Sequence, residues 1–135
     1  MRKNLKLEDK VIIIDKLPFS ELAKYTAIAD LGLSLDKDSN LNYRFSLPNK
    51  VFDYIHSNTP LLVSRLPELM KLIDHYKIGG SVKNIRPQCI ADNVNRIKSD
   101  PEQLALWKQN LIIAQKELNW EIEEEKYLKF LDQID

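Results

Sequence analysis

Short apolar runs alternate with amphipathic stretches along the first two thirds of the chain. Residues 11–14 form a continuous β-branched run, Val-Ile-Ile-Ile, which is typical of a strand buried on both faces. Similar runs at residues 31–35 and 60–63 predict two more strands, and a weaker one lies around residues 81–82 after a glycine pair that we expect to break the chain. Helical patterns separate these runs and no hairpin signal joins them. We therefore expect an α/β fold, with a Rossmann-like parallel sheet and flanking helices.

The helical patterns are marked by their first residues. Ser20 can cap a helix over residues 20–29, and residues 67–73 repeat apolar positions at helical spacing. Asp100 predicts the start of a long helix, because a proline follows it directly and a glutamine stands three residues after it. Asn119 can cap a last helix, so the chain is expected to end in two helices.

The stretch after residue 46 predicts a loop that leads into a short helix. Pro48 suits the first turn, where the free N–H groups carry partial positive charge and can hold phosphate. Lys50 and Asp53 add an ammonium and a carboxylate, so the polar arc of this helix makes a nucleotide cradle. The alternative is an ordinary amphipathic helix in which Lys50 and Asp53 form a surface ion pair. The polar arc holds Asn49, Lys50, Asp53 and Ser57, and the apolar arc holds Val51, Phe52 and Ile55.

Composition limits the classes of function. A chain of 135 residues with 44% hydrophobic and 30% charged residues suits a single domain over residues 1–135. Twenty basic residues balance twenty acidic ones, so we expect no nucleic-acid partner. Cys89 is the sole cysteine and is expected to be a small buried hydrophobe; no metal site or cofactor is predicted. Residues 1–6 are charged without a signal-length apolar run, which predicts a cytoplasmic protein without direct membrane insertion.

Other conspicuous side chains have simpler interpretations. His56 and His75 have carboxylates nearby but no nucleophile at triad spacing, so no catalytic residue is assigned. Trp107 and Trp120 fall on helical stripes and are expected to pack in the core or between helices; the alternative is a platform on which a sugar stacks. The acidic run at residues 121–125 predicts a solvated helix face.

The order of these pieces resembles a known family. The block from Ser46 to Tyr54, Ser-Leu-Pro-Asn-Lys-Val-Phe-Asp-Tyr, followed by Thr-Pro-Leu-Leu-Val at residues 59–63, is the most specific part. With residues 11–14 and the late Asn-Trp-Glu at 119–121, it is similar to the C-terminal lobe of two-lobed, GT-B type glycosyltransferases. The likeness is to family-4-like enzymes of capsule, O-antigen and exopolysaccharide assembly, and it covers nearly the whole chain.

The resemblance implies a nucleotide-sugar donor site. In the family a glutamate seven residues before the proline of the next strand holds the ribose. Asp53 stands at that spacing from Pro60, and this acid, one carbon shorter, can still accept hydrogen bonds from the ribose hydroxyls. The family's second acid, eight residues earlier, is replaced here by Phe45, so that contact with the sugar is not carried over. The resemblance places the loop at residues 15–18 near the base and residues 46–50 near the diphosphate. The donor-contacting residues it implies are Lys16, Leu17, Ser46, Asn49, Lys50 and Asp53.

The resemblance also implies that the chain is the last part of such an enzyme. Family members have an N-terminal acceptor lobe and two strand-helix units before the part matched here, so we expect a sheet incomplete on its N-terminal side and no turnover by this chain alone. The full-length parent would transfer a sugar from a UDP- or GDP-sugar to a glycan or lipid-linked acceptor, in the cytoplasm at the inner membrane surface. Either the missing lobe or self-association would complete the sheet beside residues 11–14. The alternative function is a non-catalytic α/β association module.

Overall fold

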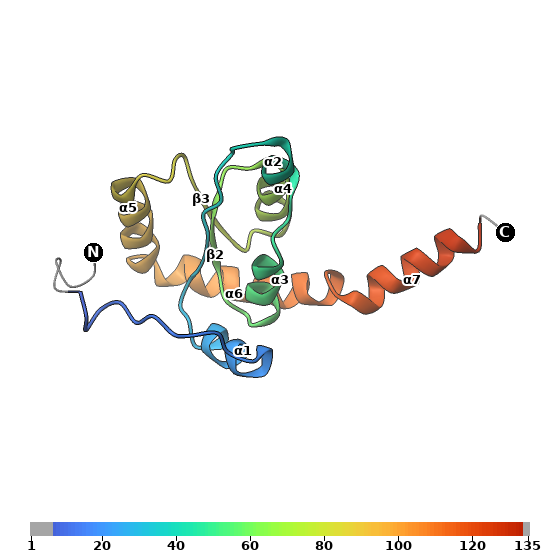
Figure 1. Ribbon diagram of the computed structural model, residues 1–135, viewed down its shortest axis with the longest axis horizontal. Coiled ribbons are helices and arrows are strands. Elements are labelled where there is room, and N and C mark those ends of the chain that lie inside the picture. Colours follow the sequence, from blue (N-terminus) through green and yellow to red (C-terminus); the bar gives the residue numbers. More distant parts are fainter. Residues whose placement is uncertain (1–6, 134–135) are drawn as a thin grey trace.

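The computed structural model describes residues 7–133, and its centre is a parallel sheet (Figure 1). Within those residues the sheet contains β1 (Gly32–Ser34), β2 (Leu61–Ser64) and β3 (Gly79–Val82), in the order β1-β2-β3. Gly32 pairs with Leu61, and Leu61 pairs with Gly79. The predicted α/β class with a parallel sheet and flanking helices is therefore confirmed.

Helices make every connection between these strands and follow the last one. The helices α3 and α4 connect successive strands, as parallel pairing requires. The helices are α1 (Phe19–Ala27), α2 (Leu41–Phe45), α3 (Asn49–His56), α4 (Pro67–Tyr76), α5 (Pro87–Lys98), α6 (Pro101–Glu117) and α7 (Trp120–Leu131).

The core lies on both faces of β2, which is buried along its whole length. Leu61 and Val63 point to the face covered by α3, α4 and α6, while Leu62 packs against Trp107 and Ile97 on the other face. On α3, Val51 and Ile55 are fully buried, as its apolar arc predicts. Removing such a side chain from water contributes roughly 1.5–3 kcal/mol. The opposite, polar arc of α3 is thereby directed away from the core.

A glycine at the start of β3 permits close strand packing. A Cβ atom at Gly79 would collide with the backbone carbonyl of Leu61 on the neighbouring strand. The glycine pair predicted to break the chain instead opens this strand, so that expectation is wrong. A side chain does not fit at residue 79, whereas a Cβ atom at Gly80 would meet its neighbours at ordinary contact distances.

Two of the predicted helix caps are confirmed and one is wrong. Asp100 accepts a hydrogen bond from the Gln103 N–H at 3.0 Å, and Asn119 accepts one from the Ile122 N–H at 3.0 Å. Ser20 lies inside α1, whose N-cap is Pro18 without a side-chain hydrogen bond. The segment after β1 leads into the short helix α2, which is not among the predicted helices and which the Asn40 side chain caps.

Residues 11–14 do not form the predicted buried strand. They are exposed, Ile12 at 80% and Ile13 at 76%, and they belong to no ladder of the sheet. The run starts from a turn in which the Val11 N–H donates to the Leu7 carbonyl. A β-branched run becomes a strand when a neighbour supplies ladder hydrogen bonds, and the described residues supply none here. The expectations for residues 1–6 lie outside the described residues.

The C-terminal helix extends away from the sheet (Figure 1). No residue of α7 is buried, and the acidic run at residues 121–125 has its carboxylates in solvent, as predicted. Trp107 is buried, but Trp120 is 74% exposed, so the packing expected for Trp120 is wrong. Cys89 is half-buried. Among residues 7–133, no helix has both the length and the apolar character needed to cross a membrane.

Candidate functional site

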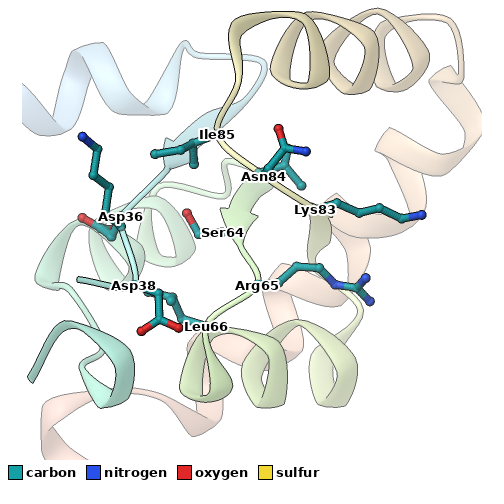
Figure 2. Close-up of a pocket in the computed structure, with 10 residues that line it drawn as sticks. Asp36, Asp38, Ser64, Arg65, Leu66, Lys83, Asn84 and Ile85 are labelled. Atoms are coloured by element: carbon teal, nitrogen blue, oxygen red, sulfur yellow. The ribbon is translucent and has the colours of Figure 1, made fainter. Parts of the chain in front are cut away.

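The segments that leave the carboxyl ends of the three strands line a cavity of about 300 Å³ (Figure 2). In parallel α/β sheets, ligands bind at this edge. The side chains around the cavity carry both signs of charge. Its lining residues are Asp36, Lys37, Asp38, Ser64, Arg65, Leu66, Val82, Lys83, Asn84 and Ile85.

Asp36 is held in place at the edge of this cavity. The Ser34 hydroxyl donates a hydrogen bond of 2.8 Å to Asp36 Oδ2, and the Lys50 ammonium lies 3.1 Å from the same oxygen. These contacts join the end of β1 to the first turn of α3. Lys50 therefore pairs with Asp36 rather than with Asp53, and the surface pair considered from the sequence is not formed.

Ser64 places an unsatisfied hydroxyl beside the same cavity. The side chain is 5% exposed, and its Oγ has no hydrogen-bond partner among residues 7–133. An unpaired buried hydroxyl costs about 1–3 kcal/mol. Figure 2 shows Ser64 between Asp36 and Asn84, while Arg65 and Lys83 extend together to the opposite side from Asp36. The two cations thus do not converge on the hydroxyl in this conformation.

A second, larger cavity of about 870 Å³ lies along the polar arc of α3. Asn49 and Asp53 of α3 line it, together with residues from α1 and the start of α7. The Asp53 carboxylate has no hydrogen-bond or ion-pair partner within the described part of the chain. The other residues that line this cavity are Phe19, Leu47, Phe52, His56, Leu118, Asn119, Trp120 and Glu123. We refer to it as the α3 cavity.

The predicted site residues are only partly brought together. Asn49 and Asp53 share the α3 cavity, whereas Lys50 turns to Asp36 at the carboxyl edge of the sheet. Ser46 donates a hydrogen bond of 3.2 Å to the Tyr43 carbonyl at the end of α2. The other two predicted residues precede α1 and line neither cavity; they are Lys16, which is exposed, and Leu17, which is half-buried.

The sequence interpretation missed the residues at the carboxyl edge. Asp36, Ser64 and Lys83 each stand at or within two residues after the end of a strand. The rule that ligands meet the carboxyl ends of parallel strands could have found them. The missed aromatic residues of the α3 cavity gave no such signal, because Phe19 and Trp120 are far apart in the sequence.

The described residues contain no cluster suited to a metal ion. Within residues 7–133, no group of three or more histidine, cysteine, aspartate or glutamate side chains is placed to hold one. The chemistry available in the α3 cavity is therefore that of a free carboxylate, an amide and an imidazole beside aromatic rings.

Comparisons with known protein families, with curated proteins and with solved structures gave no match.

Proposed function

We propose that the chain is the donor-binding part of a glycosyltransferase and that it binds a nucleoside diphosphate-sugar in the α3 cavity. The observation that carries the proposal is the free carboxylate of Asp53 beside Asn49 on one wall of an 870 Å³ cavity. Ligand sites for small molecules have volumes of about 300–1,000 Å³ and contain a few well-placed polar groups. A cavity of this size and lining fits a nucleotide.

Asp53 is the residue for the ribose. An ionised carboxylate has two oxygens that accept hydrogen bonds, and the two hydroxyls of a ribose can donate to both. Asp53 is half-buried and makes no competing contact with the described residues, so a ligand does not have to displace a protein partner. Its position on the polar arc of α3 is fixed by Val51 and Ile55, which anchor the helix in the core.

The first turn of α3 is the place for the diphosphate. This helix has no side-chain cap, and the Val51 N–H donates to the Pro48 carbonyl at 2.9 Å. The N–H groups of Asn49 and Lys50 have no partner among residues 7–133, so they can donate to an anion. The Lys50 ammonium adds a full positive charge in the same turn; its side chain is 41% exposed and pairs with Asp36. Phosphate oxygens can share this ammonium with Asp36.

Sugar transfer requires more than donor binding. The parent enzyme would pass the sugar from a UDP- or GDP-sugar to a glycan or lipid-linked acceptor, and the chain by itself would not turn over. Its partners are the donor and either an acceptor-binding lobe or a second copy of the chain, at the cytoplasmic face of the inner membrane.

Calorimetric titration of UDP, GDP and ADP into the purified chain tests the proposal. Saturable binding of at least one nucleotide, with uridine or guanosine binding more weakly than its diphosphate, is expected. Absence of binding for all three at millimolar concentration would contradict it.

The second candidate function is a non-catalytic association module. It is favoured by α7, a helix that buries none of its residues and exposes Tyr127, Leu128, Phe130 and Leu131. Large exposed apolar patches mark interaction surfaces. Self-association without nucleotide binding would favour this function over the first.

A further inference from the structure

Two exposed aromatic residues stand at the α3 cavity. Trp120, the first residue of α7, is 74% exposed, and Phe19, the first residue of α1, is 71% exposed. Both line the cavity that contains Asp53. Other aromatic residues of the chain are exposed too, but Phe19 and Trp120 are the exposed rings that line this cavity with Asp53. Their ring faces are therefore available to a ligand held there.

The position of Trp120 is fixed by its neighbours rather than by its own packing. Asn119 caps α7 through the Ile122 N–H, and its amide group donates to the carbonyls of Gln115 and Lys116 at 3.4 and 3.0 Å. The junction between α6 and α7 is therefore held by three hydrogen bonds. The indole extends from this junction toward solvent at the cavity, where its face is available to a ligand.

The polar side chains that line the α3 cavity differ in how they are engaged. Apart from the indole N–H of Trp120, those without a hydrogen-bond or ion-pair partner in the described chain are Asn49, Asp53 and His56, and all three belong to α3. On the side of α7, Asn119 is engaged in the cap and Glu123 is paired with Lys126 at 2.6 Å. The α7 side thus offers a ring face, with the indole N–H of Trp120 as its unpartnered hydrogen-bonding group among the described residues.

We propose that Trp120 is the stacking platform for the base of the bound nucleotide, with Phe19 as a second apolar contact. The inference rests on the proposed function, because it assigns the base of the nucleotide whose ribose Asp53 holds. Every base has a π-face, and stacking on an aromatic side chain tolerates different bases. Asn119 and Glu123, the polar cavity residues beside the indole on α7, are already paired, so the ring face binds a planar base with little selection among bases.

Tryptophan fluorescence gives a direct readout of this contact. The chain has two tryptophans, and Trp107 is buried in the core against Leu62, away from the α3 cavity. Quenching of the exposed indole by a stacked base therefore reports on Trp120. UDP and GDP are expected to quench the emission and to protect it from acrylamide. Both changes are expected to disappear in Trp120→Phe at saturating nucleotide, because a phenyl ring is silent at the wavelength that excites an indole.

Affinity measurements separate the base from the rest of the ligand. Trp120→Ala should weaken UMP binding at least about fivefold, the lower end of what loss of one stacked base costs. It should leave the affinity for ribose 5-phosphate, which has no base, unchanged. Tyr127→Ala is the matched control, because Tyr127 is an aromatic residue of the same helix, 62% exposed, that does not line the cavity.

The outcomes distinguish the inference from the proposed function. Nucleotide binding that falls in Asp53→Ala but is unchanged in Trp120→Ala would overturn the stacking role alone. An equal loss for UMP and ribose 5-phosphate in Trp120→Ala, or an equal loss in Tyr127→Ala, would also overturn it. A larger loss for UDP-glucose than for UDP would assign Trp120 to the sugar instead of the base. Absence of any nucleotide binding would overturn both the inference and the proposed function.

Discussion

Lys50 and Asp36 form an ion pair that joins the first turn of α3 to the segment after β1, with 3.1 Å between Lys50 Nζ and Asp36 Oδ2. The lysine side chain is 41% exposed and the aspartate side chain 22% exposed. A pair of this exposure contributes at most about 1 kcal/mol to stability. Its main effect is to hold the ammonium at the carboxyl edge of the sheet, beside Asp36.

Lys50→Ala is expected to weaken binding of UDP more than binding of uridine. The ammonium acts on phosphate charge, and loss of a charge-assisted hydrogen bond costs about 1.5–3 kcal/mol, or roughly ten- to 150-fold in affinity. Calorimetry with both ligands measures the difference. Equal losses for UDP and uridine would show that Lys50 does not contact the diphosphate.

Asp36→Asn is the counterpart of that variant. It removes the negative charge that competes for Lys50 but keeps the ammonium and nearly the same side-chain shape. UDP affinity is therefore expected to stay the same or to rise. A fall comparable to that of Lys50→Ala would mean that Asp36 positions the lysine and that the pair acts as one unit.

Gly79→Ala is expected to destabilise the fold by more than about 1 kcal/mol, in the range of overpacked cores. The added Cβ collides with the Leu61 carbonyl between β2 and β3, and backbone atoms cannot move aside as a side-chain end can. Gly80→Ala is the control, since its Cβ would lie 3.6 Å from the Trp107 ring. Urea unfolding of both variants measures the two free energies; equal values would contradict the close strand packing.

Tyr76 links α4 to α6, and its ionisation makes the free energy of unfolding depend on pH. Its hydroxyl donates to Glu117 Oε2 at 3.0 Å; burial, and then this hydrogen bond and the charge of Glu117, raise the pKa of Tyr76 above its usual value. In the unfolded chain the phenol ionises first, so this stabilisation is complete below the usual tyrosine pKa and is lost as the pH rises above it. NMR titration should show that Glu117→Gln lowers the pKa of Tyr76. An unchanged pKa would contradict the contact.

Local signals explain which elements could be predicted. The caps at Asp100 and Asn119 act within three residues, and the buried arc of α3 follows from the spacing of Val51 and Ile55. Residues 11–14 were misjudged because a β-branched run indicates apolar character but not a pairing partner. Pairing depends on a neighbouring strand, which is not a property of the run itself.

In the candidate site, too, only the features set by local spacing could be predicted from the sequence. Asn49 and Asp53 could be found because they share one arc of a single helix. The pairing of Lys50 with Asp36 could not, because it joins residues 14 positions apart through the path of the chain after β1. Trp120 was misjudged because its stripe faces solvent instead of the core, and only the direction of α7 decides that.

Comparison of UDP and GDP binding by the wild-type chain, Asp53→Ala and Asp74→Ala tests the central claim most directly. Asp74 is an exposed aspartate of α4 that lies outside the α3 cavity, so its variant controls for loss of one negative charge. Neither change should alter stability by more than about 0.5 kcal/mol, because neither carboxylate has a hydrogen-bond or ion-pair partner among residues 7–133. The account predicts that Asp53→Ala weakens nucleotide binding about tenfold or more, while Asp74→Ala binds like the wild type. Equal affinities of the wild type and Asp53→Ala would contradict it.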